Sequence, residues 1–119
     1  SSPQARLMVA HCGSVSTAAD MRRFLARHAN AVCDLSARGW PLQKNRFAVY
    51  DERTLARDWQ QLIEDHADRF AVGVDLADNL QAYEASVQAI RNGLLANLTP
   101  ATAEKVAWRN AEVWFGLRF

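Results

Sequence analysis

The sequence predicts an α/β fold built on a small parallel sheet. Three short apolar runs, at about residues 6–11, 31–35 and 69–74, have the length and composition of buried strands. Segments in which apolar residues recur every three or four positions separate these runs and indicate helices. Strands that alternate with helices need crossover connections, so we expect the strands to be parallel and the connections right-handed.

Four helices are expected, and most of them have a recognisable start. They span about residues 18–28, 52–65, 79–95 and 100–115. Thr17 and Asp20 have the spacing of a capping box for the first helix. Asn79 can cap the third, and Pro100 stands at the first position of the last, which is expected to stop at Gly116.

Size and charge narrow the class of protein. At 119 residues and 50% hydrophobic content, the chain fits one domain with its own core. A net charge of +1 argues against nucleic acid as a partner. No apolar run approaches the roughly 20 residues of a membrane-spanning helix, and the first residues do not resemble a signal peptide. A cytoplasmic protein that does not bind membranes is therefore expected.

Two other features are open to more than one interpretation. Cys12 and Cys33 are too few for a disulfide framework and are expected to be small buried side chains, with a nucleophilic Cys12 as the alternative. The segment 37–51 is longer than most connections. Its aromatic residues, such as Trp40 and Tyr50, either line a substrate pocket or pin the loop to the body of the domain.

The strongest candidates for chemistry follow two strands. His11 comes directly after the first apolar run, and Asp75 comes directly after the third. Parallel strands present their carboxyl ends at one edge of the sheet, where α/β folds place their active sites. His28 and His66 lie at helix ends, where a positive side chain suits the helix dipole, so both are expected on the surface.

Four segments, in order, carry a resemblance to a known family. They are residues 9–13 (VAHCG), 30–36 (NAVCDLS), 68–75 (DRFAVGVD) and 99–117. Together they resemble the C-terminal part of amidohydrolase-related enzymes, which are metal-dependent TIM-barrel hydrolases and decarboxylases. The resemblance implies that the chain forms the last three βα units of such a barrel, followed by its closing helix.

The resemblance also implies roles for the two residues at the strand ends. Asp75 corresponds to an aspartate that binds the catalytic divalent metal, with zinc expected, and that accepts a proton. His11 corresponds to a histidine that binds metal or acts as acid or base on a small carboxylated substrate. The chain has no His-x-His pair, which the family uses as metal ligands.

The chain alone is therefore expected to be inactive, as a fragment of a larger hydrolase or decarboxylase. The alternative is a non-catalytic, truncated barrel module that acts in oligomerisation or subunit complementation. A flavodoxin-like nucleotide binder is disfavoured, because the chain has no phosphate-binding loop.

A partial barrel leaves one face of its sheet uncovered. Strand alternation predicts that Leu7, Val9 and His11 share this face with Ala71 and Gly73 of the third strand. Because a parallel sheet is normally covered on both sides, we expect the chain to form a homo-oligomer through this face.

Overall fold

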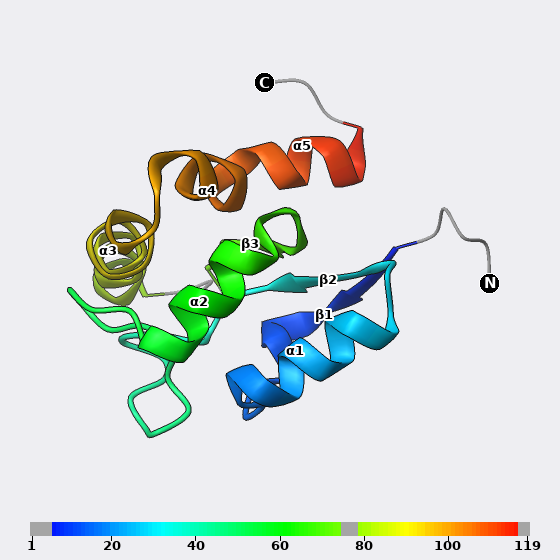
Figure 1. The fold of residues 1–119 in the computed structure, drawn as a ribbon. Helices are drawn as coiled ribbons and strands as arrows, with labels where there is room; N and C mark the ends of the chain where they lie inside the picture. Colours follow the sequence, from blue (N-terminus) through cyan, green and yellow to red (C-terminus); the bar gives the residue numbers. More distant parts are fainter. Residues whose placement is uncertain (1–5, 75–78, 117–119) are drawn as a thin grey trace.

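A three-stranded parallel sheet lies at the centre of the computed structural model, which describes residues 6–74 and 79–116. Strands β1 (Leu7–Val9), β2 (Ala31–Asp34) and β3 (Phe70–Ala71) are adjacent in that order (Figure 1). The predicted α/β class with a parallel sheet is confirmed. Each strand is shorter than expected, and Asp75 lies outside the described residues.

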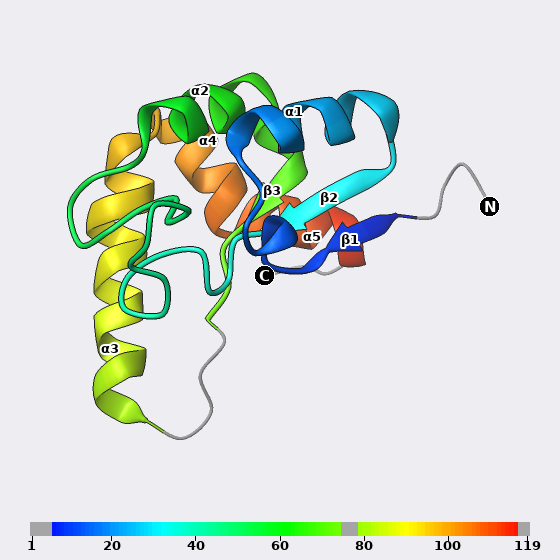
Figure 2. The same ribbon diagram turned by 90° about the horizontal axis from the view of Figure 1, so that it is seen from below.

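Helices α1 (Ala18–Arg27) and α2 (Arg57–Asp65) cover the same face of the sheet (Figure 2). The predicted capping box begins α1, since the Thr17 hydroxyl accepts from the Asp20 amide at 3.1 Å and the Asp20 carboxylate accepts from the Thr17 amide at 3.2 Å. Apolar side chains of both helices share one buried core with Cys33 and Phe70 of the sheet. Those side chains are Met21, Leu25, Trp59, Leu62 and Ile63.

Two longer helical segments make up the C-terminal part. The first contains α3 (Leu80–Ala89) and continues through a π-helical turn, η3 (Ile90–Leu94), and a 3₁₀ turn, η4 (Leu95–Asn97). The second contains α4 (Pro100–Glu104), the π-helical turn η5 (Lys105–Arg109) and α5 (Asn110–Phe115). It ends at Gly116 in the left-handed conformation, as predicted. Among the helices described, none combines the length and apolarity needed to cross a membrane.

The second segment, residues 100–115, covers the outer edge of β3 (Figure 1). The Phe70 carbonyl accepts from the Asn110 side-chain amide at 2.8 Å, and the Val72 amide donates to the Val106 carbonyl at 3.0 Å. These are the backbone groups that a further strand would pair with on this side of β3. A helix therefore occupies the position of a fourth strand.

One prediction about the sheet faces is wrong. The register places Met8 beside Val32 and Val9 beside Cys33, and Val9 packs against the helix-covered core. Val9 and its neighbours on that side thus face the helices, whereas Met8 faces the opposite side. The prediction placed Val9 on the same face as His11 by strict alternation along one strand. The strand ends at Val9, so this alternation does not extend to His11.

The long connection between β2 and α2 is held by Tyr50. Its side chain is 5% exposed, and its backbone forms isolated bridges with Gly39 and Leu55. The ring fills the space that a side chain at Gly39 would need, and burial raises the pKa of Tyr50 to about 12. Tyr50 therefore pins the loop, whereas Trp40 borders a cavity of about 530 Å³ beside residues 51–54.

Candidate functional site

His11 lies at the carboxyl end of the sheet and contacts the residues that follow β2. Its Nδ1 lies 2.8 Å from both the Ser36 carbonyl oxygen and the Ser36 hydroxyl. A carbonyl oxygen can only accept, so Nδ1 carries the hydrogen in this contact. The lone pair of the neutral ring is then on Nε2, the atom that can take up a proton or bind a metal.

Asp34 supports this arrangement from the end of β2. Its Oδ1 accepts hydrogen bonds from the Ser36 hydroxyl and from the Ser36 backbone amide, the latter at 2.8 Å. The Ser36 side chain is buried, while His11 and Asp34 are partly exposed. The three residues form a hydrogen-bonded row from a carboxylate through a hydroxyl to an imidazole, which we call the Asp34–Ser36–His11 row.

The turn after β1 gives His11 its orientation. Residues 11–14 all have positive φ, with values of 54° at His11, 44° at Cys12, 80° at Gly13 and 58° at Ser14. Residues other than glycine rarely adopt positive φ. They keep it only where the surrounding structure holds the backbone in place.

Arg38 helps to hold the turn of residues 11–14 in this conformation. It is fully buried, and its guanidinium donates to the carbonyls of Cys12 at 2.9 Å, Ser16 at 2.9 Å and Phe47 at 2.8 Å. It also lies 4.9 Å from the centre of the Trp59 ring. Burial lowers the pKa of Arg38 to about 10, which leaves it charged at neutral pH. A buried cation thus ties the His11 turn to the loop after β2.

Gly73 brings the end of β3 close to the same row. A side-chain carbon at Gly73 would lie 3.0 Å from Cβ of Ser36 and 3.6 Å from the Asp34 carboxylate. The carboxyl ends of all three strands therefore meet at the Asp34–Ser36–His11 row. The predicted site residue Asp75 follows two positions later and lies outside the described residues.

The two cysteines adjoin this row in the sequence, since Cys12 follows His11 and Cys33 precedes Asp34. Both are fully buried, as predicted, but their sulfur atoms form a disulfide between the turn after β1 and β2, which the sequence analysis did not expect. Their Cα atoms are 5.0 Å apart. A separation of 21 residues hides this proximity, which follows only from the pairing of β1 with β2.

The other two histidines lie away from the site. His28 is exposed at the end of α1, as predicted, with its ring 4.5 Å from that of Phe24. His66 is partly buried, and its pKa is lowered, first by burial and then by the positive charges of Arg22 and Arg69. The charged form of His66 is therefore disfavoured, although the helix dipole was expected to favour a positive side chain at this position.

Three residues of this site were not predicted from the sequence. Asp34 and Ser36 lie in the segment 30–36 that carries the family resemblance, so their position after a strand could have identified them. Nothing in the sequence marked Arg38, because a buried arginine in an irregular loop has the same sequence pattern as an exposed one.

The described residues do not complete a metal centre. Within residues 6–74 and 79–116, no group of three or more histidine, cysteine, aspartate or glutamate side chains is placed to hold a metal ion. Comparisons of the chain with protein-family models, curated proteins and solved structures found no match.

Proposed function

We propose that the chain carries part of the active site of a metal-dependent hydrolase or decarboxylase acting on a small carboxylated substrate. The observation that supports this proposal is the Asp34–Ser36–His11 row at the carboxyl end of a parallel sheet. That end of α/β sheets is where substrates bind, because the strand bodies are packed away while the following loops remain accessible.

His11 has the chemistry of a general acid or base in this proposal. With Nδ1–H donated to Ser36, Nε2 is the atom that takes a proton from the reacting group or returns it. Once His11 is charged, the Asp34 carboxylate stabilises the imidazolium through the Ser36 hydroxyl, and it also keeps the ring orientation fixed.

Metal binding is assigned to Asp75 together with His11. A catalytic zinc ion needs three protein ligands, and the described residues alone do not bring three together. Further ligands would have to come from the remainder of a barrel, and the chain on its own would not turn over substrate.

Zinc titration of the purified chain by calorimetry tests this assignment. We expect weak binding that falls at least tenfold in His11→Ala and in Asp75→Ala, and less steeply in Ser36→Ala, where only the ring orientation is lost. His28→Ala is the matched control and should bind like the unaltered chain. Equal affinity in all five proteins would reject the site.

In a longer parent enzyme the sharper test is Asp75→Asn. This change keeps the size of the side chain but removes its charge and its ability to accept a proton, so turnover should disappear. Retained turnover would exclude the assigned role. A His-x-His pair in coding sequence upstream of Ser1 would supply the missing ligands.

The second candidate is a non-catalytic module that acts in oligomerisation or subunit complementation. The covered outer edge of β3 favours it, because Phe70 and Val72 already have hydrogen-bond partners where barrel closure needs a neighbouring strand. Met8, at 42% exposed on the opposite sheet face, is a residue that self-association could bury.

Light scattering after size-exclusion chromatography tests the module directly. A stable monomer of 13.3 kDa at micromolar concentration would contradict self-association. A dimer that is weakened by Met8→Glu, but not by Leu42→Glu at another exposed apolar position, would support it.

A further inference from the structure

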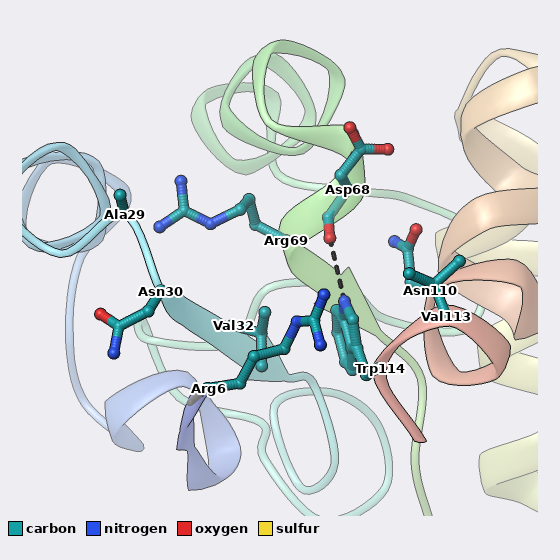
Figure 3. Close-up of a pocket in the computed structure, with 9 residues that line it drawn as sticks. All are labelled: Arg6, Ala29, Asn30, Val32, Asp68, Arg69, Asn110, Val113 and Trp114. Atoms are coloured by element: carbon teal, nitrogen blue, oxygen red, sulfur yellow. Dashed lines mark hydrogen bonds between the residues drawn. The ribbon is translucent and has the colours of Figure 1, made fainter. Parts of the chain in front are cut away.

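A second cavity lies at the amino ends of the strands, at the opposite end of the sheet from His11. Its volume is about 400 Å³, within the range of small-molecule sites. Figure 3 shows its lining, which comes from the residue before β1, the connection between α1 and β2, β2 itself, the turn before β3, and α5. The cavity shares no lining residue with the Asp34–Ser36–His11 row.

The charges around this cavity favour an anion. Arg6 and Arg69 contribute guanidinium groups, and Asp68 is the acidic residue among the described lining. The Asp68 carboxylate forms an ion pair with Lys105 at 2.9 Å, and Figure 3 shows it turned away from Arg6. The field inside the cavity is therefore positive.

The two arginines differ in how tightly their side chains are held. Arg69 is fixed to the wall, since it donates to the carbonyls of Ala31 and His28, both at 2.6 Å. Arg6 is exposed, and its guanidinium has no hydrogen-bond or ion-pair partner among the described residues. A flexible guanidinium can close on a carboxylate with two parallel hydrogen bonds, while Arg69 adds charge from a fixed position.

The remaining wall combines two asparagines, Asn30 and Asn110, with apolar side chains, of which the Trp114 indole is the flat one. Trp114 and Val32 both line the cavity, and the Trp114 Nε1 donates to the Asp68 carbonyl at 3.3 Å (Figure 3). The indole is thereby held in one orientation. An aromatic ring can stack on such a surface, which inorganic anions cannot use.

We propose that this cavity binds a small aromatic carboxylate, with the ring against Trp114 and the carboxylate on Arg6. The site is separate from the proposed active site and does not depend on its chemistry. The ligand class follows from the pairing of a positive field with a fixed aromatic wall.

Three probes of related shape and charge test the proposal by calorimetric titration of the folded chain. Benzoate has both features, benzamide has the same ring without the charge, and inorganic phosphate has charge without the ring. We expect benzoate to bind at least tenfold more tightly than either of the others. If benzamide bound as tightly as benzoate, the role of the arginines would be overturned. If phosphate bound as tightly as benzoate, the role of the Trp114 ring would be overturned.

Variants identify the location of binding. Arg6→Gln should weaken benzoate at least tenfold, whereas Arg23→Gln, which changes an exposed arginine of α1, should leave it unchanged. Benzoate should also shift the indole N–H resonance of Trp114 in the NMR spectrum. No binding of benzoate, or identical affinity in Arg6→Gln, would overturn the proposal.

Discussion

Arg38 shows how a single side chain can determine the geometry of a site that it does not enter. Its hydrogen bonds reach the turn of residues 11–14 and the loop near Phe47, and the described acceptors are neutral oxygens rather than carboxylates. The positive charge is therefore balanced by backbone dipoles and by the Trp59 ring. Removing it takes a charged donor away from the carbonyls of Cys12, Ser16 and Phe47.

Arg38→Met tests this role at similar side-chain volume. We expect the free energy of unfolding to fall by roughly 2–5 kcal/mol, because each buried acceptor left unpaired costs about 1–3 kcal/mol. Urea denaturation measures the change. Arg46→Met, at an exposed position of the same loop, should change stability by less than about 0.5 kcal/mol. Similar values for both variants would contradict the account.

Sequence reasoning reached only part of this site. His11 was identifiable because it follows an apolar strand, and its neighbours Asp34 and Ser36 could have been found in the same way. Arg38 could not, because its burial depends on three segments that meet only in the folded chain. The disulfide partner of Cys12 was hidden for the same reason.

At the scale of elements, two further contacts help to fix the C-terminal helices to the rest of the fold. Gly93 lies where the helical segment of α3 and η3 crosses the turn at Asp51, and a side-chain carbon there would overlap the Asp51 carbonyl. Glu64 of α2 reaches the start of α4. The glycine at position 93 thus permits a close approach between the helix and this turn.

Gly93→Ala tests the crossing. Alanine normally stabilises a helix relative to glycine by up to about 1 kcal/mol. Here we expect a net loss of about 1–3 kcal/mol, since backbone must move to make room. Urea denaturation gives the sign of the change. Asn92→Ala, at the neighbouring exposed position, is the control and should be neutral or stabilising; a stabilised Gly93→Ala would disprove the tight crossing.

Glu64 makes helix capping depend on pH. Its carboxylate accepts from the Thr99 amide at 2.7 Å and from the Thr102 hydroxyl at 2.6 Å. Burial alone would raise the pKa of Glu64, but these hydrogen bonds outweigh it and hold the pKa below the ordinary 4.5. The stabilisation is thus complete above pH 4.5 and is lost as the pH falls through the lowered pKa.

Glu64→Gln should therefore lower the free energy of unfolding by about 1 kcal/mol at neutral pH, as does the loss of a helix cap. The difference from the unaltered chain should become smaller in acid. Thermal unfolding across this pH range provides the measurement. Glu84→Gln, on the exposed face of α3, should show no such difference. A constant gap between the Glu64 variant and the unaltered chain at every pH would refute the role of its charge.

For the whole molecule, the class and order of elements followed from sequence because periodicity and capping residues are local signals. The faces of β1 were misassigned because alternation ends where the positive-φ turn begins at His11. The covering of β3 was not foreseeable, since it rests on Asn110 reaching a strand 40 residues earlier. Contacts between distant segments are what local patterns omit.

Asn110→Leu tests that covering at nearly constant volume. The Asn110 side chain donates to the carbonyls of Ala67 and Phe70, so its loss should lower stability by about 1–3 kcal/mol. Hydrogen exchange at the Val72 amide, which is bound to Val106, should accelerate more than exchange in α1. Asn92→Leu is the exposed control. Unchanged protection at Val72 would mean that the helix is held by other contacts.

The helix over β3 also limits how copies of this chain can associate. A sheet grows into a filament only if each copy offers two usable edges, one to receive a neighbour and one to extend. Here Val106 and Asn110 already bind the β3 side. Edge-to-edge pairing through β1 would therefore end at two copies, which protects the chain against open-ended fibre growth as long as the last helix stays in place.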